Sequence, residues 1–315
     1  MLLHHGRQLS LSPTWRDSGF DSKLRSADGR VTRSLLPIDP RTEPRLTMAA
    51  MLNIVGRRNR QILSTAGNLT LGAPAAAESA RGVSRRVGVL DWKQISKELD
   101  TQGWALIQSL ISSADCDLLA GLYPQEGRFR SRIVMSRHGF GRGEYKYFSY
   151  PLPRTIAALR TSLYRHLAPI ANRWNSALRI HAHYPATHAE FITRCHGAGQ
   201  TRPTPLLLQY GVDDYNCLHQ DLYGEHVFPL QVAILLSEPD RDFTGGEFVL
   251  TEQRPRMQSR AHVVPLRQGD AVIFAVCYRP VQGTRGAYRV SLRHGVSRLR
   301  SGKRHTLGVI FHDAK

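Results

Sequence analysis

The C-terminal third of the chain alternates short apolar runs with turn residues. Such runs occur at 206–210, 228–236, 247–250, 262–266, 271–276, 287–292 and 306–311. Clusters of Gly, Pro, Asp, Arg and Ser separate them. Short strands with regular turn signals are typical of a β-sandwich or barrel. Residues 205–315 are therefore predicted to form an all-β core.

Helical periodicity precedes this region. Residues 91–102 have a capping aspartate at their start and a glycine directly after their end, which predicts a helix. A strand at 104–110 and a second helix over 112–122 follow. In 154–178 apolar residues recur at three- and four-residue intervals, which predicts a third helix. The predicted fold class is mainly β with an α-helical N-terminal layer (α+β).

The first 87 residues differ from the rest of the chain in composition and in hydrophobic pattern. Residues 1–87 are rich in Arg, Ser, Pro, Gly and Ala and lack sustained apolar periodicity. They are predicted to be a disordered basic tail, or an upstream misreading of the gene. The predicted domain is then 88–315, in which 88–204 supplies helical support and a substrate hairpin and 205–315 supplies the catalytic core.

Composition excludes several classes of protein. The chain is 41% hydrophobic and 22% charged, which is enough for a buried core. No run approaches about 18 consecutive apolar residues, so no membrane span is expected. Four scattered cysteines without a Cys-x-x-Cys pair disfavour a disulfide scaffold and a zinc finger. A reducing, cytoplasmic location is the expectation.

Positive charge is segregated along the chain. The net charge is +18, and residues 254–304 hold twelve basic residues against the single acidic Asp270. Residues 128–154 hold seven basic residues against Glu144. A genomic preference for Arg, of which there are 37 against 6 Lys, explains the choice of cation but not this segregation. A polyanionic partner, nucleic acid above all, is therefore predicted.

The candidate chemistry begins at His219 and Asp221. Residues two apart on a strand point to the same side, so this pair supplies two ligands of a 2-His-1-carboxylate triad for Fe(II). Alone, His-x-Asp is a weak signal in a chain with 14 His, and most such pairs are surface residues. His294 follows Asp221 by 73 residues and suits the third ligand. Arg304, ten residues later, can bind a carboxylate bidentately.

This order of residues resembles the Fe(II)/2-oxoglutarate-dependent oxygenase superfamily, which has a double-stranded β-helix (jelly-roll, cupin-like) core. Further matches lie in the strand 206–211, the Gly-Gly-Glu hairpin 243–248, the strand 265–274 and the segment 103–107. The resemblance covers about residues 88–315. It implies an enzyme that uses Fe(II), 2-oxoglutarate and O2.

The resemblance also implies roles for individual residues. His219, Asp221 and His294 would bind iron and form the catalytic centre. Arg304 would pair with the distal carboxylate of 2-oxoglutarate, and Tyr210 would donate a hydrogen bond to it, with His305 as a further candidate. Prolyl hydroxylases of the superfamily usually have Lys at the Arg304 position, which weakens a close prolyl-hydroxylase assignment.

The substrate assignment draws on resemblance and charge together. The run 205–315 is most similar to a bacterial subgroup described as oxygenases acting on damaged, alkylated nucleic acid, with chemistry like that of AlkB. This implies oxidation of an N-methyl group and release of succinate, CO2 and formaldehyde. Cations and aromatics near the two basic segments suit a nucleic-acid strand. The candidate substrate residues are Arg130, Arg142, Tyr145, Tyr147, Arg254 and Arg256.

Other interpretations remain open at this point. Residues 128–150 also fit an ordinary β-hairpin whose aromatics pack on the helical layer. The same superfamily contains protein (prolyl-type) and small-molecule hydroxylases. A non-catalytic β-barrel module is a third class, for which His219→Ala would change nothing measurable. Steep salt dependence of oligonucleotide binding would favour nucleic acid.

Overall fold

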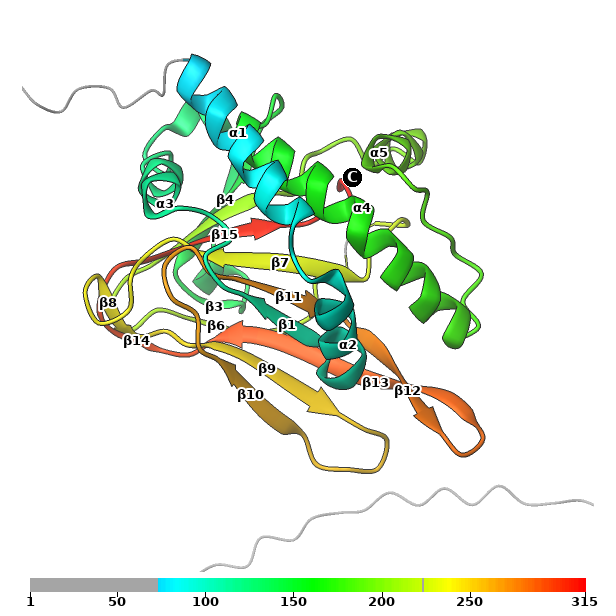
Figure 1. The fold of residues 1–315 in the computed structure, drawn as a ribbon. Helices are drawn as coiled ribbons and strands as arrows, with labels where there is room; N and C mark the ends of the chain where they lie inside the picture. The colour runs from blue at the N-terminus through cyan, green and yellow to red at the C-terminus, as the bar shows by residue number, and fades with distance from the viewer. Residues whose placement is uncertain (1–72, 223) are drawn as a thin grey trace, which may run out of the picture. The chain divides into compact units, whose positions relative to one another are not determined.

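The computed structural model describes residues 73–222 and 224–315, and these residues build two packed antiparallel sheets covered by helices (Figure 1). The larger, which we call the major sheet, has seven strands. In spatial order they are β1 (Trp104–Ile107), β11 (Ala271–Ala275), β7 (Leu230–Leu235), β15 (Arg304–Val309), β5 (Leu206–Tyr210), β4 (Glu144–Phe148) and β2 (Phe129–Val134).

The second sheet, which we call the minor sheet, lies against one face of the first. Its strands are β10 (Arg260–Val264), β9 (Phe248–Gln253), β13 (Gly286–Val296), β6 (Tyr215–His219) and β3 (Gly141–Arg142), with β12 (Tyr278–Gly283) paired to β13. A two-stranded ribbon joins β8 (Phe243–Gly245) to β14 (Leu299–Gly302). From β5 to β15 the chain passes back and forth between the sheets, which is the topology of a double-stranded β-helix. The predicted fold class is confirmed.

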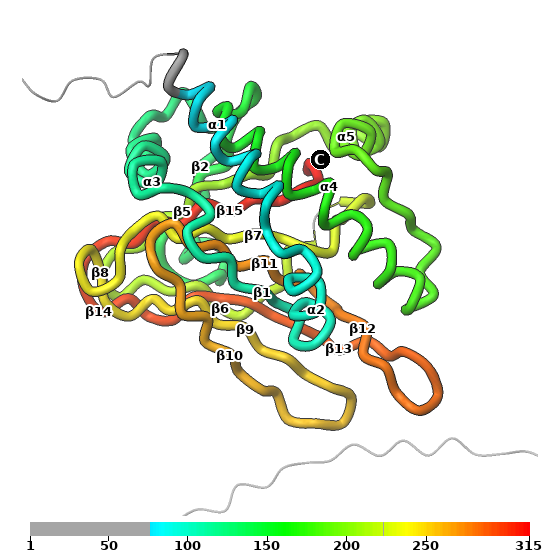
Figure 2. Tube along the Cα trace, in the orientation of Figure 1, coloured from blue at the N-terminus to red at the C-terminus, as the bar shows by residue number. Residues whose placement is uncertain are grey.

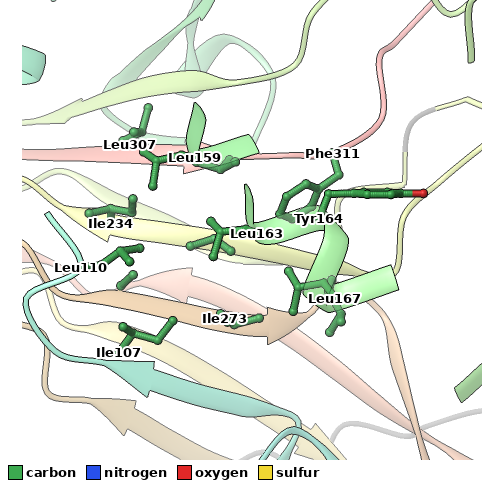
Figure 3. Close-up of a cluster of buried hydrophobic side chains, with 14 of the residues drawn as sticks. Ile107, Leu110, Leu159, Leu163, Tyr164, Leu167, Ile234, Ile273, Leu307 and Phe311 are labelled. Atoms are coloured by element: carbon green, nitrogen blue, oxygen red, sulfur yellow. The ribbon is translucent and has the colours of Figure 1, made fainter. Parts of the chain in front are cut away.

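The helices cover the other face of the major sheet. They are α1 (Ala73–Gly88), α2 (Trp92–Gln102), α3 (Ser113–Ala120), α4 (Arg154–Ala177) and α5 (His188–Gly197), with short 3-10 turns η1 (Glu126–Arg128) and η2 (Met135–Arg137). The tube in Figure 2 shows α1 and α4 running together across this face. Figure 3 shows Leu159, Leu163 and Leu167 of α4 directed at the strands that hold Ile234 and Ile273.

Burial patterns explain which strands are central. Every residue of β7 and β11 is buried, because helices cover one face of these strands and the minor sheet covers the other. In β9 buried positions alternate with partly exposed ones, as expected for a strand with one face in the core. A second apolar cluster, including Phe248, Leu250 and Phe274, fills the space between the sheets.

The helix predictions agree with the structure at their ends. Asp91 accepts a hydrogen bond from the Gln94 amide, and Gly103 ends the helix with φ 81°. Ser112 caps α3 in the same way.

Residues 128–150 do contain a hairpin, since β2 and β4 pair antiparallel. Phe129 and Phe148 pack with the helical layer as that interpretation expects, whereas Tyr145 and Tyr147 belong to the cluster between the sheets.

The predicted boundary at residue 87 is wrong, because it falls inside α1. Val83 and Val87 of this helix are fully buried, and α1 packs along α4. Only this sparse four-residue spacing marks the apolar stripe in a segment otherwise rich in Ala, Arg and Ser, so periodicity did not reveal it. The remainder of the predicted tail, residues 1–72, lies outside the described residues.

Two further expectations can be compared with the structure. All four cysteines are free, and none forms a disulfide. Within the described residues, none of the helices combines the length and apolar character that crossing a membrane requires.

Candidate active site

Three predicted metal ligands converge between the sheets. His219 ends β6, Asp221 follows two residues later, and His294 lies on the neighbouring β13 directly opposite His219. The Nε2 atoms of His219 and His294 each lie 3.4 Å from a different oxygen of Asp221. One ligand atom from each residue lies within 4.8 Å of the others. This is the donor set and spacing of a facial triad for Fe(II).

The local sequence sets this geometry. The Nδ1–H of His219 donates to the Cys217 carbonyl oxygen at 2.8 Å, which directs Nε2 toward Asp221. Gly295 follows His294, and a Cβ there would meet the Asn216 carbonyl oxygen at 2.6 Å. The absence of a side chain therefore lets the two ligand strands approach closely.

Gln220, between the first two ligands, joins them to the strand of the third. Its Nε2 donates to the Leu292 carbonyl oxygen at 2.7 Å and lies 3.3 Å from both the Cys277 carbonyl oxygen and the Ser291 Oγ. This amide is therefore a positioning group for the triad.

The charges of Asp221 and His294 suit a cation. Burial would lower the pKa of His219, but hydrogen bonding to Asp221 outweighs burial, so that the pKa of His219 is raised. Burial alone would raise the pKa of Asp221, but hydrogen bonds from His219 and His294 hold it well below its usual range. Burial lowers the pKa of His294, and the nearby His219 acts in the same direction. Asp221 is therefore a carboxylate and His294 a neutral imidazole at neutral pH, as metal ligation requires.

Arg304 lies in the same pocket, at the start of β15. Its side chain is 1% exposed, and within the described residues no carboxylate oxygen lies within 4.0 Å of it. One Nη donates to the Thr306 hydroxyl at 2.6 Å, whereas Nε has no partner. Burial lowers the pKa of this guanidinium to about 10. A buried cation with an unused N–H group fits the carboxylate of a bound dicarboxylate such as 2-oxoglutarate.

A pocket of about 340 Å³ connects these groups. Besides the triad and Arg304, its walls include the predicted residues Tyr145, Tyr147 and Tyr210. Tyr210 lies opposite Arg304 in the β5–β15 pair, with its ring 5.6 Å from the guanidinium carbon. Burial raises the pKa of Tyr145, and the Asp221 carboxylate acts in the same direction, which places this phenol on the metal side.

The four predicted substrate arginines lie outside this pocket. Arg130 packs on the Tyr147 ring at 4.4 Å and donates to the Pro203 carbonyl oxygen. Arg142 is exposed on β3 and lies 3.9 Å from an Asp214 oxygen. Arg254 and Arg256 lie in the turn between β9 and β10. None of the four lines the pocket.

His305 does not reach the pocket. It alternates with Arg304 along β15, so its imidazole points to the opposite face of the sheet and contacts the Gln209 amide at 2.8 Å.

Among the lining residues that the predictions did not include, Gln231 and Phe140 are the most informative. Gln231 is 4% exposed, and its amide nitrogen has no hydrogen-bond partner within the described residues. It is the only polar residue of β7, and a polar residue in an apolar run is a signal that could have identified it. Phe140 lines the pocket and is 46% exposed, so it lies at the mouth.

A jelly-roll sandwich with a His-x-Asp…His triad between its sheets and a buried arginine on the last strand defines an Fe(II)- and 2-oxoglutarate-dependent oxygenase. Comparison with family models gives the particular family. Residues 143–314 match Oxygenase-NA, described as "Oxygenase, catalysing oxidative methylation of damaged DNA". The match spans more than half of the chain, and the chain therefore belongs to this family.

Relatives extend the comparison. Over 189 residues the chain is 52% identical to an uncharacterised protein of Mycobacterium tuberculosis, Rv2227, covering 60% of this chain and 78% of that protein. Among solved structures, a prolyl-4-hydroxylase from Pseudomonas putida is 14% identical with a TM-score of 0.39, covering 71% of this chain and 99% of that one. A 2OG-Fe(II) oxygenase family oxidoreductase from Burkholderia pseudomallei is 15% identical with a TM-score of 0.41, covering 72% and 93%.

Proposed function

We propose that this protein is an Fe(II)- and 2-oxoglutarate-dependent dioxygenase that removes N-alkyl groups from bases of damaged nucleic acid. The observation that carries the proposal is that one pocket holds both the three-ligand cluster and the buried Arg304, whose Nε has no hydrogen-bond partner among the described residues. The description of the family, which concerns damaged DNA, supports the substrate class.

The pocket residues have separate roles in binding the metal, binding the cosubstrate and excluding water. His219, Asp221 and His294 would hold Fe(II) on one face and leave its other positions open. Arg304 would bind the distal carboxylate of 2-oxoglutarate, with Tyr210 beside it. The apolar walls between the sheets exclude water from the reacting groups.

Bound Fe(II) with 2-oxoglutarate and O2 would supply oxidation of a C–H bond, with one oxygen atom entering succinate and the other the substrate. An N-methyl group then becomes N–CH2OH, and CO2 is lost from the cosubstrate. The C–N bond of this hemiaminal breaks to release formaldehyde, and the base nitrogen regains its proton. No side chain with a specially tuned pKa is needed for this sequence.

The pocket suits a base that has left its stack. Phe140 and Leu218 line it and are 46% and 43% exposed, so apolar side chains border the mouth. Tyr145 and Tyr147 lie further inside, with their rings 5.4 Å apart. Flat aromatic and aliphatic surfaces of this kind stack on any base.

The test is a product assay with a matched variant. Purified protein is supplied with Fe(II), 2-oxoglutarate and oligonucleotides carrying different N-methylated bases, and succinate and formaldehyde are measured. Equal amounts of both products are expected with at least one lesion. Arg304→Met should raise the KM for 2-oxoglutarate about 10- to 150-fold, because a charge-assisted hydrogen bond contributes about 1.5–3 kcal/mol. Arg304→Lys should lose less.

Two outcomes would contradict parts of the proposal. Succinate without formaldehyde from every lesion would keep the oxygenase and exclude demethylation. An unchanged KM in Arg304→Met would remove Arg304 from the cosubstrate site. The cytoplasmic location expected from the sequence stays a prediction.

A further inference from the structure

Two hairpins of the minor sheet carry exposed arginines. Arg254 and Arg256 lie in the β9–β10 turn, and Arg260 begins β10. Arg285 lies in the β12–β13 turn, and Arg289 follows on β13. We call residues 252–262 and 278–293 the arginine hairpins. Because β9 pairs with β13, the hairpins are neighbours, and Figures 1 and 2 show both projecting from one end of the molecule.

The charge of the arginine hairpins is largely uncompensated. Glu252 is their only acidic residue. It is 3% exposed and already pairs with Arg279 at 2.5 Å, with Arg254 at 3.1 Å and with Arg260 at 3.5 Å. Within the part of the chain that the structure describes, Arg256, Arg285 and Arg289 form no ion pair. Exposed, unpaired cations gathered on neighbouring hairpins attract a polyanion.

The other basic segment, 128–154, differs. Arg132 pairs with Glu144, and Lys146 pairs with Glu126 at 2.6 Å. Arg130 packs on the Tyr147 ring and donates a hydrogen bond to the Pro203 carbonyl oxygen. Much of the positive charge of this segment is therefore paired within the fold. The arginine hairpins are the stronger candidate surface for binding a polyanion.

The hairpins connect directly to the candidate active site. Gln220, between two metal ligands, donates to the Leu292 carbonyl at the base of the β12–β13 hairpin. Arg289 lies five residues from His294 on the same strand, or about 17 Å at 3.3–3.4 Å per residue, with its side chain on the outer, exposed face of the minor sheet. Phosphates along a stacked strand are spaced by about 3.4 Å of helix axis and lie further apart in an extended strand, so Arg289 is at most about five nucleotides from a base at the metal.

We propose that the arginine hairpins bind the phosphodiester backbone of the nucleic-acid strand whose base enters the pocket. The inference rests on the proposed function for the identity of the strand. It adds where the strand runs: from the pocket along β13 to Arg285 and Arg289, with Arg256 on the neighbouring hairpin.

The first test measures binding. Arg285→Ser/Arg289→Ser is compared with the wild type and with Arg165→Ser/Arg179→Asn, which removes the same charge from α4 and the residues after it. Affinity for a methylated 15-nucleotide strand is measured against salt by fluorescence anisotropy. Each phosphate contact contributes about 0.7–0.9 to the slope of log affinity against log salt. The hairpin variant should lose about 1.4–1.8 of slope, equivalent to about 25- to 60-fold weaker binding at 0.1 M salt. The control variant should match the wild type.

The second test separates this inference from the proposed function. On a methylated mononucleotide, which is too short to reach Arg289, the hairpin variant should release formaldehyde as fast as the wild type. On the 15-nucleotide strand at subsaturating concentration it should be slower. A salt slope and a 15-nucleotide rate equal to those of the wild type would overturn the hairpin role even if formaldehyde is produced. Hairpin-dependent binding without formaldehyde from any lesion would support the surface and overturn the demethylase.

Discussion

The two sheets of the sandwich differ in what covers them and in what they carry. The major sheet is enclosed between the helices and the minor sheet, and β7 and β11 are buried throughout. The minor sheet has one face in the core, and β6 is exposed or half-exposed along its length. Of the three candidate metal ligands, His219 and His294 lie in the minor sheet and Asp221 follows the end of β6 by two residues, whereas Arg304 comes from the major sheet.

This difference separates stability from metal binding. Apolar burial is the main source of folding free energy, and the larger of the two clusters of buried residues lies between the helices and the major sheet. The minor sheet needs only enough packing to hold His219 and His294 in register. Substitutions on the two sheets should therefore affect different measurements, and the following predictions test that separation from the largest effect to the smallest.

Asp221→Ala should abolish turnover. The variant removes the only carboxylate of the triad and leaves two imidazoles, one of which is neutral through burial. Iron content after anaerobic loading and succinate formation should both fall to background, while far-UV circular dichroism stays as in the wild type. Glu225→Ala removes an exposed carboxylate nearby and should change neither. Retention of one iron per chain by Asp221→Ala would show that the metal binds elsewhere.

Leu163→Ala should weaken packing on the major sheet and lower the free energy of unfolding. Leu163 of α4 is fully buried against the major sheet (Figure 3). Its truncation should lower the free energy of unfolding by about 2–5 kcal/mol, through lost burial and the cavity left behind. Leu163→Met should cost less than about 1.5 kcal/mol. Denaturant unfolding measures this, and iron affinity of the folded variant should be unchanged. A loss of iron affinity would contradict the separation.

The sequence predicted the parts of the site that depend on strand alternation and motif order. His219, Asp221, His294 and Arg304 lie in one pocket, as expected. Arg130 and Arg142 were predicted for this site but lie outside the pocket. The distribution of charge along the sequence does not show which cations have partners within the fold. The net charge of residues 128–154 does not show that Arg132 pairs with Glu144 on the neighbouring strand. Nor does it show that Lys146 pairs with Glu126, which lies outside this segment.

Fold prediction failed where tertiary packing decides. The strand runs at 206–210 and 271–276 are matched closely by β5 and β11. The helix α1 was missed because its buried face has few large apolar residues, and α4 rather than intrinsic pattern stabilises it. The strand β6 was missed since its residues are mostly exposed, and pairing with β13 holds it.

Gln220→Leu should weaken iron binding. The change removes the hydrogen bond to Leu292 that links the two ligand strands and keeps a side chain of similar size. Loss of groups that orient metal ligands typically lowers metal affinity about 10- to 100-fold. Iron titration should show this shift, while the KM for 2-oxoglutarate at saturating iron stays the same. Gln282→Leu, on the β12–β13 hairpin, is the control, and equal iron affinity in both variants would exclude a positioning role for Gln220.

The smallest expected effect concerns pH and the end of the major sheet. His312 follows β15, is fully buried, and accepts a hydrogen bond from the Phe228 amide through Nδ1. Burial lowers its pKa to about 4, and Arg160 acts in the same direction. The unfolded value is about 6.5. The stability that neutral His312 provides is therefore complete above about pH 6.5 and is lost as pH falls toward 4, because the unfolded chain binds the proton more tightly.

His312→Asn keeps an acceptor for the Phe228 amide but cannot be protonated in this range. The free energy of unfolding of the metal-free wild type should fall between pH 7 and pH 5, and that of the variant should fall by about 1–2 kcal/mol less. Other titrating groups, including His294, are common to both proteins and cancel in the difference. Denaturant unfolding at pH 7, 6 and 5 measures it. Parallel curves would mean that His312 binds its proton equally tightly in the folded and the unfolded chain. The acid sensitivity would then have to come from other buried histidines, such as His188 and His305.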